Sequence, residues 1–307
     1  TVKSGDLANT VVSAESVVFI TDAAILHPGE TMTLLDEQSV VEAKRVQKTN
    51  LMTESAYAVG TTTRGTGTLS MDDDGNVIYT IDKVTNEASH NTVMGVQAGM
   101  AALAVGNDFI GAAVDGLGLP ANTGADGIAA FAQVGGGKLK QETGSHVNVN
   151  TWNAIIALGH KNAKEKSMTE YGAFLEYGRG NYTTHNGTER GDGSMHYTGG
   201  GVLAKWQHPS GFYWEGSLRA GSSRDNARSV LRDAWGNPAS YSTNAGYWGA
   251  HIGVGKILDL GHGNEVDIYG KYFMNRRNNA SFDVGTDHYD LDAVTSSVIR
   301  LGGCYST

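Results

Sequence analysis

The stretch "FYWEGSLRAG" (residues 212–221) decides the fold, because two kinds of side chain alternate along it. Trp214 and Leu218 fall on one face of an extended strand, and Glu215 and Arg219 fall on the other. A period of two predicts a β-strand with unlike faces. Two environments fit such a strand. In a soluble sandwich the charged face meets water, whereas in an outer-membrane barrel the apolar face meets lipid.

The composition allows a barrel and disfavours several other classes. Of the 307 residues 40% are hydrophobic, and the mean hydropathy of −0.28 argues against a bundle of membrane helices. A barrel strand needs apolar residues only at alternate positions. The 42 Gly beside 4 Pro favour a closely packed, bent sheet over a disordered linker. The net charge is −9 without a basic tract, so we expect no nucleic-acid partner.

Beyond Gly124 the alternation recurs in about eight runs, each long enough for a tilted strand to cross a membrane. The runs are "IAAFAQVGGGKLK", "HVNVNTWNAIIALGH", "TEYGAFLEYGRGNY", "MHYTGGGVLAKW", "FYWEGSLRAG", "GYWGAHIGVGKILDL", "NEVDIYGKYF" and "VTSSVIRLGGCYS". One face of these runs is apolar, and the other carries charges of both signs. We predict that this second face lines a lumen, with Glu176, Lys205, Glu215, Arg219, His251, Asp267, Lys271 and Arg300.

Turn lengths and aromatic positions favour lipid over water. Short turns, "HPSG" and "GHGN", alternate with polar stretches at 182–194, 222–243 and 277–290, which we predict to be long loops. Outer-membrane barrels have short periplasmic turns and longer extracellular loops. Because tryptophan and tyrosine favour the membrane interface, we predict interfacial positions for Trp206, Trp214 and Tyr272.

Residues 89–117 predict a helix, with Ser89 or Asn91 as its N-cap. Small residues recur along one side, and polar residues interrupt the apolar composition. Three interpretations remain open: a transmembrane helix with a glycine face, a buried helix of a soluble domain, or a helix threaded through a pore. The barrel-like strands that follow favour the third. Its predicted pore residues are Gly95, Gln97, Gly99, Ala102, Gly106 and Asp108.

Residues 1–88 contain short β-like runs separated by turn signals. A hairpin is predicted in "GTLSMDDDGNVIYTID", with its turn at Asp74–Gly75. The acidic cluster Asp72–Asp74 invites a calcium interpretation, but the spacing of a calcium-binding loop is absent. We therefore expect no metal site there.

Taken in order, six strand motifs resemble the C-terminal translocator barrel of autotransporters, the type V secretion proteins. They are "FAQVGGGKLK", "EYGAFLEYGRGNY", "HYTGGGVLAKW", "FYWEGSLRAG", "DIYGKYF" and "VIRLGGCYS". The segment "GVQAGMAAL" resembles the linker helix before such barrels, and "HPGETMTLLD" resembles the end of a β-solenoid passenger. The resemblance implies three parts: the end of a passenger (1–88), a linker helix in the pore (89–123) and a barrel (124–307).

The resemblance implies an all-β protein with a transmembrane antiparallel barrel and a helix in its lumen. Family barrels have about twelve strands, whereas about eight are found here, and eight strands enclose only side chains. We therefore expect an incomplete barrel, truncated at its C-terminal end, and open edges that lipid cannot satisfy. The 307-residue chain alone is not expected to insert stably.

The implied function is that of an outer-membrane translocator that exports or anchors a passenger at the surface of a Gram-negative-type bacterium. Its implied partners are outer-membrane lipid, periplasmic chaperones, the barrel-assembly machinery and its own passenger. No G-x-S-x-G, H-E-x-x-H or phosphate-loop motif occurs, so we expect neither an enzyme nor a cofactor. Asn91 and Asn107 lie in no family self-cleavage motif. The alternatives are an outer-membrane channel or surface barrel without a secretion role, and a soluble β-rich adhesin.

Overall fold

The computed structural model divides the chain into two compact units. The first unit comprises Thr1–Thr92, Leu231–Ala239 and Asp283–Tyr289, and the second comprises Val93–Val230, Ser240–Phe282 and Asp290–Thr307. The predicted boundary between linker and barrel, at 123–124, lies outside the described residues. The described residues are 18–20, 27–35, 54–85, 87–117, 126–142, 145–164, 167–186, 189–285 and 287–306.

The second unit is built on one eight-stranded sheet in which strands that follow each other in the chain pair antiparallel. This confirms the predicted all-β class and the eight alternating runs. A small hairpin of β13 (Ala280–Val284) and β14 (Asp287–Leu291) separates the last two strands of the sheet. The eight strands are β6 (Asp126–Glu142), β7 (His146–Lys164), β8 (Ser167–Asn186), β9 (Glu189–Gln207), β10 (Phe212–Arg232), β11 (Pro238–Gly261), β12 (Asn264–Arg277) and β15 (Val294–Ser306).

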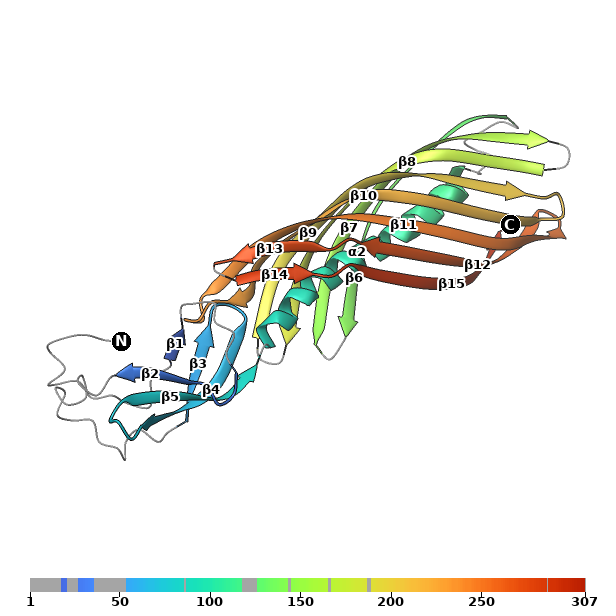
Figure 1. Cartoon of the computed structure of the whole chain (residues 1–307). Helices are drawn as coiled ribbons and strands as arrows, with labels where there is room; N and C mark the ends of the chain where they lie inside the picture. Colours follow the sequence, from blue (N-terminus) through green and yellow to red (C-terminus); the bar gives the residue numbers. More distant parts are fainter. Residues whose placement is uncertain are drawn as a thin grey trace. The chain divides into compact units, whose positions relative to one another are not determined.

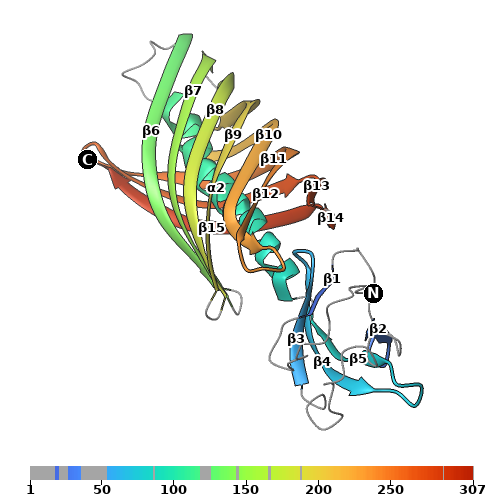
Figure 2. The ribbon, with the colours of Figure 1, turned by 90° about the vertical axis from the view of Figure 1, so that its left-hand side faces the viewer.

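The sheet curls around helix α2 (Glu87–Leu117), which lies along its concave face (Figures 1 and 2). The window Asn91–Leu117 is long and apolar enough to cross a membrane, but 72% of its most apolar part is buried inside the protein. Here its partners are strand side chains rather than lipid. A single apolar cluster joins Phe109, Ile110, Ala113, Val114 and Leu117 of the helix to Ala129, Ile155, Ala157, Phe174 and Leu203 of the strands.

Two local predictions were wrong. The helix begins at Glu87, so Ser89 and Asn91 lie inside it and cannot be its N-cap. The polar stretches expected as long loops are continuations of β8 to β11 and the β13–β14 hairpin. Their outer side chains are polar, which makes the composition resemble a loop. On the inner side buried residues such as Tyr182 and Tyr241 continue the alternation, and this is why the backbone stays extended.

Tyrosine rings and glycines explain much of the high glycine content. Tyr197 faces Gly178 across the β8–β9 pair. Four residues further along the same two strands, Tyr182 faces Gly193. A Cβ added at either glycine would overlap the facing ring. The missing side chain lets the ring lie flat on the neighbouring strand, so that the curved inner face stays closely packed.

The first unit contains a five-stranded sheet in the order β1-β3-β4-β5-β2. Its strands are β1 (Val18–Ile20), β2 (Thr31–Leu35), β3 (Glu54–Val59), β4 (Thr63–Met71) and β5 (Val77–Thr85). β1 and β3 pair parallel, as the strands of a β-solenoid do, whereas the other neighbours pair antiparallel. The core of this sheet consists of Tyr57, Val59, Leu69, Val77, Tyr79 and Ile81.

The predicted hairpin turn at Asp74–Gly75 is confirmed, and its acidic side chain has a structural partner. Asp72 accepts hydrogen bonds from the backbone and the side chain of Asn76, at 2.8 and 3.0 Å. These bonds lower the pKa of the Asp72 carboxyl below its usual value. The turn between β10 and β11 repeats the arrangement, with Asp233 bound to Asn237 in the same way. Both turns use the sequence pattern D-x-x-G-N.

Within the first unit, the turn between β3 and β4 is held by the tip of β14. Asp287 accepts hydrogen bonds from the backbone N–H and the hydroxyl of Thr61, at 2.5 and 2.6 Å. The same hydroxyl lies 2.7 Å from the Tyr289 hydroxyl. Gly60 has a positive φ of 50°, and any side chain there would strike the Asp287 carboxylate. Residues far apart in the sequence thus close one buried polar contact.

We expect Thr61→Val to loosen this turn, because it leaves the buried Asp287 carboxylate with only the backbone N–H as a partner among these contacts. The local opening free energy should fall by about 1–3 kcal/mol, measured by hydrogen–deuterium exchange of the 60–62 amides. Thr62→Val is the matched control, since its hydroxyl contacts only Thr63 in the described structure. Equal exchange rates in the two variants would contradict the assignment.

Candidate functional site: the inner face and its helix

The two faces of the sheet have opposite character. Glu215 is fully buried and its neighbour Trp214 is 47% exposed, which is the alternation read in residues 212–221. The other predicted lumen residues lie on the same side as Glu215. Glu176, Arg219, His251 and Lys271 are buried, whereas Lys205, Asp267 and Arg300 are partly buried.

A row of charges crosses this inner face from strand to strand. Lys161 on β7 pairs in register with Glu170 on β8, which pairs with Lys205 on β9, which pairs with Glu215 on β10. Opposite charges at directly facing positions attract across a sheet. Glu215 continues the row to Lys271 on β12, with Oε1 and Nζ 2.7 Å apart. We call these five residues the inner charge row.

The helix adds an acid to the row. Asp115, in the last turn of α2, accepts hydrogen bonds from Lys205 at 3.2 Å and from Lys271 at 3.3 Å. A carboxylate near a helix C-terminus is disfavoured by the helix dipole, and α2 has no basic residue of its own in that turn. The two lysines of the sheet supply the compensating charge, so the end of the helix is positioned by strand residues.

A second contact between helix and sheet centres on Arg219. Its Nη1 donates to Glu176 at 2.8 Å, and both side chains are almost fully buried. Three oxygens surround its Nη2: the backbone carbonyl of Leu103 and the side-chain oxygen of Asn107 on the helix, each at 2.8 Å, and that of Asn275 on β12, at 2.6 Å. One guanidinium therefore joins the helix to two strands besides its own.

A third contact joins Asp108 of the helix to Arg300 of β15. Both side chains are partly exposed, so solvent screens this pair more than the Arg219–Glu176 pair. The Asp115 contact lies in the last turn of the helix, whereas the Arg219 and Arg300 contacts lie nearer its middle, at the consecutive residues Asn107 and Asp108. Together with the apolar cluster, they fix both its rotation and its height along the sheet.

The predicted small residues of the helix have different surroundings. Gly95 lies against Asp225 and Tyr182, and Gly106 lies against Tyr197 and Arg219; a Cβ at either glycine would overlap these groups. A Cβ at Gly99 would meet no atom within 4 Å. Ala102 is completely buried, and Gln97 is partly buried. Of the predicted pore glycines, Gly95 and Gly106 therefore lie close to strand side chains and Gly99 does not, so the small residues do not form a continuous contact stripe.

The predicted interfacial aromatics lie on the outer face of the sheet. Trp206 and Trp214 face each other across β9 and β10, close to the His208–Gly211 turn. Tyr272 is 39% exposed, and its hydroxyl lies 2.9 Å from that of Ser297. Phe273, its neighbour in β12, points inward and stacks on His251, with ring centroids 4.5 Å apart.

Sequence reasoning missed several inner-face residues, among them Lys161, Glu170, Asn275 and Asp225. Glu170, Asp225 and Asn275 lie an even number of positions from predicted inward residues of their own strands; Asn275, for example, is four positions from Lys271. Extending the alternation to the strand ends would have found these three. Lys161 lies on β7, for which no inward residue was predicted. Among the described residues, no group of three histidine, cysteine or acidic side chains is placed to hold a metal ion.

Comparison with known proteins adds one relative. The chain is 26% identical over 158 residues to a probable autotransporter, YpjA, of Escherichia coli strain K12. The predicted resemblance to autotransporters is confirmed. The match covers 48% of this chain and 10% of the autotransporter, so the chain spans a small part of that relative. No protein-family model matches the chain.

We expect Arg219→Met to destabilise the second unit strongly, because it leaves the buried Glu176 carboxylate without its cation. Breaking a buried ion pair in this way costs about 3–5 kcal/mol, to be measured by urea unfolding of the complete protein. Adding Glu176→Gln should recover part of the loss. Arg224→Met is the matched control, since Arg224 lies on the outer side of the same strand and is exposed. A comparable loss in that control would refute the role of the buried pair.

Proposed function

We propose that the chain is part of an outer-membrane translocator of type V secretion, which holds a passenger at the cell surface. Residues 1–88 form the end of the passenger, 89–123 form the linker helix in the pore, and 124–307 form the barrel. The homology to an autotransporter and the curled antiparallel sheet around an apolar helix support this proposal.

The observation that carries the membrane assignment is a change along the outer face of each long strand. On β10 the outward positions are apolar from Phe212 to Ala220 and then become Ser222, Arg224, Asn226 and Arg228. On β8 they change from Tyr171, Ala173, Leu175 and Tyr177 to Arg179, Asn181 and Thr183. The apolar part of β10 has the length that a tilted strand needs to cross a membrane, about 9–11 residues. We call this zone the apolar belt.

Aromatic side chains stand at both margins of the apolar belt. Phe212 and Trp214 mark the margin near the His208–Gly211 turn. Trp248 marks the opposite margin on β11, and Trp152 packs edge-to-face on Tyr177 there, with ring centroids 5.9 Å apart. Two aromatic girdles around an apolar band are the pattern of an outer-membrane barrel. A soluble adhesin has no reason to expose such a band.

In the proposed assignment the inner charge row and Arg219 act on the helix and on the passenger chain that crosses the pore. They supply electrostatic contacts and no chemical step, so the translocator is not an enzyme. The expected partners are outer-membrane lipid, the barrel-assembly machinery, periplasmic chaperones and the passenger itself. The polar ends of β8 to β11 and the β13–β14 hairpin would then lie outside the cell.

Matched arginine substitutions on the outer side of β8 test the membrane assignment. In the complete protein, Leu175→Arg should prevent surface exposure of an epitope placed within residues 1–88, because arginine at mid-membrane costs about 2–4 kcal/mol. Thr183→Arg, on the same face beyond the belt, should leave the epitope exposed. External protease on intact cells provides the measurement. Normal display of the Leu175→Arg protein would overturn the proposal.

Ion conductance through the protein distinguishes a translocator from the alternative function, an outer-membrane channel. Deleting residues 93–117 from the complete protein removes the helix that fills the concave side of the sheet. A plugged translocator should then conduct far more ions across a planar bilayer, whereas a channel that conducts past the helix should change little. Heat-modifiable migration on gels controls for folding. Unchanged conductance from a folded deletion variant would favour the channel.

A further inference from the structure

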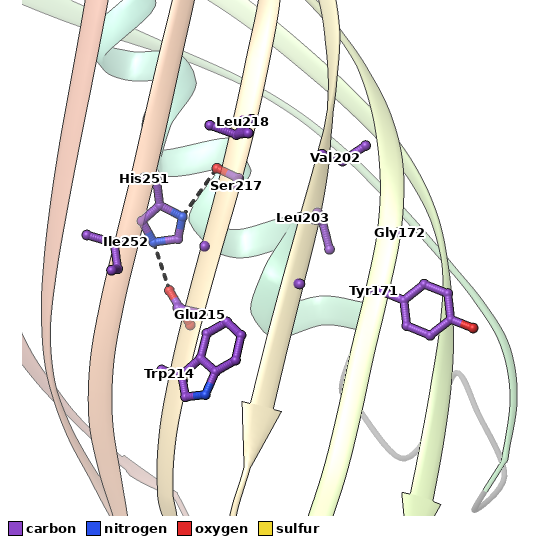
Figure 3. A pocket seen from close by; sticks show the side chains of 12 residues that line it. Tyr171, Gly172, Val202, Leu203, Trp214, Glu215, Ser217, Leu218, His251 and Ile252 are labelled. Atoms are coloured by element: carbon purple, nitrogen blue, oxygen red, sulfur yellow. Dashed lines mark hydrogen bonds and ion pairs between the residues drawn. The ribbon is translucent and has the colours of Figure 1, made fainter.

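The outer face of the sheet is hollowed at one place inside the apolar belt (Figure 3). The floor of the hollow is formed by Ala204 on β9 and Gly216 on β10, which lie directly opposite each other in register. The cavity has a volume of about 550 Å³, within the range of small-molecule pockets. We call it the outer-face hollow.

Large side chains surround this floor on all sides. Tyr171 on β8 is in register with Ala204 and forms one wall, and Ile252 on β11 forms the wall beyond Gly216. Val202 and Leu218, another cross-strand pair, close one end along the strands. Trp214 closes the other. The hollow is therefore one side chain deep, because the sheet carries an alanine and a glycine where its neighbours carry bulky groups.

The polar side chains beneath the floor of the hollow bond to one another on the inner face of the sheet. His251 Nε2 lies 3.0 Å from Glu215 Oε1, and its Nδ1 lies 3.3 Å from the Ser217 hydroxyl (Figure 3). These side chains belong to the inner face and are buried there. The surface that the hollow presents outward is thus almost wholly hydrocarbon, which excludes charged and sugar-like ligands.

Two polar atoms lie at the edge of the hollow. In the described structure, neither the Trp214 indole N–H nor the Tyr171 hydroxyl has a hydrogen-bond partner, and the Tyr171 hydroxyl points away from the hollow (Figure 3). Such rings keep an apolar body in hydrocarbon and a polar tip in the wet interface. An occupant therefore has a long apolar part in the hollow and a polar part beside the Trp214 indole.

We propose that the outer-face hollow binds one acyl chain of a membrane phospholipid, near its ester end. The inference rests on the proposed function, because the hollow lies within the apolar belt and is continuous with its lipid-facing surface. An unfilled hollow would leave its walls without dispersion contacts, and a flexible acyl chain can fill an irregular space. A second copy of the chain would need a complementary apolar projection, whereas this face of β8 to β11 is hollowed.

Bromine-labelled lipid tests the proposal in the complete protein. Trp214 is kept as the single tryptophan by changing Trp152, Trp206, Trp235 and Trp248, and every tryptophan outside residues 1–307, to phenylalanine; a second protein keeps only Trp248. Both are folded into phosphatidylcholine vesicles whose acyl chains are brominated near the ester end. Because a bound chain stays beside its ring, Trp214 fluorescence should be quenched more strongly than Trp248 fluorescence.

Filling the hollow should remove the excess quenching. Ala204→Leu places a leucine on the floor, whereas Ala220→Leu places one on the same outer face of β10 outside the hollow. We expect Ala204→Leu to reduce Trp214 quenching to the Trp248 level and Ala220→Leu to leave it unchanged. Native mass spectrometry from detergent should show one retained phospholipid, lost in the Ala204→Leu protein.

The same measurements distinguish a failure of the proposed function from a failure of lipid binding in the outer-face hollow. If neither tryptophan is quenched, the sheet does not face lipid and the proposed function falls with the hollow. If both are quenched equally and Ala204→Leu has no effect, only ordinary lipid contact exists and the hollow is not a binding site. If Trp214 quenching falls as protein is concentrated in the vesicles, a second copy covers the hollow instead.

Discussion

The structure depends on a mutual requirement between the helix and the inner face of the sheet. The sheet presents Arg219, Glu176 and Glu215 on its concave side, where all three are nearly inaccessible to water. Charges in such a place are stable only when they are paired and hydrogen-bonded. The helix accepts hydrogen bonds from Arg219 through a backbone carbonyl and the Asn107 side chain. The sheet in turn supplies Lys205 and Lys271, which bind Asp115 of the helix. Without the helix, Arg219 would lose two of its hydrogen-bond acceptors, and without the sheet, Asp115 would lose its two lysine partners.

Packing reinforces this requirement. Glycines of the helix and of the strands allow close approach of large side chains, so that Tyr197 contacts both Gly178 on the next strand and Gly106 on the helix. The Tyr197 hydroxyl also donates a hydrogen bond to the side-chain oxygen of Asn153 on β7, at 2.9 Å. A curved sheet brings strands that are not neighbours within reach of one tyrosine. The glycines make room for the tyrosine ring, and the curvature brings its hydroxyl to a buried polar partner two strands away.

The outer face obeys a different constraint along the same strands. Its side chains contact others on the same face, such as Trp152 with Tyr177 and Tyr272 with Ser297, so their character follows the medium outside rather than a buried core. The change from Ala220 to Ser222 on β10, and from Tyr177 to Arg179 on β8, falls in strands that continue without interruption. The inner face stays buried past this point. Each of these strands therefore has three kinds of surface: a buried inner face, an apolar part of the outer face and a polar part of the outer face.

The sequence alone determined the strand character of the eight runs in the large sheet and which face of each run is apolar, because alternation is a local property of an extended backbone. It placed Glu215 and Arg219 inward and Trp214 outward, and it located a long helix with small residues at close contacts. It misjudged the polar strand ends, since polar outer side chains resemble loop composition when their buried inner partners are overlooked.

Only the tertiary structure decided which groups meet. Asn107 is 112 residues from Arg219, and Thr61 is 226 residues from Asp287, and no local pattern encodes such pairs. The order of charges in the inner charge row likewise requires the strand register, because a shift of one residue would turn each side chain to the other face. The outer-face hollow exists because Ala204 and Gly216 meet in that register, which the short His208–Gly211 turn sets and which side-chain alternation by itself does not specify.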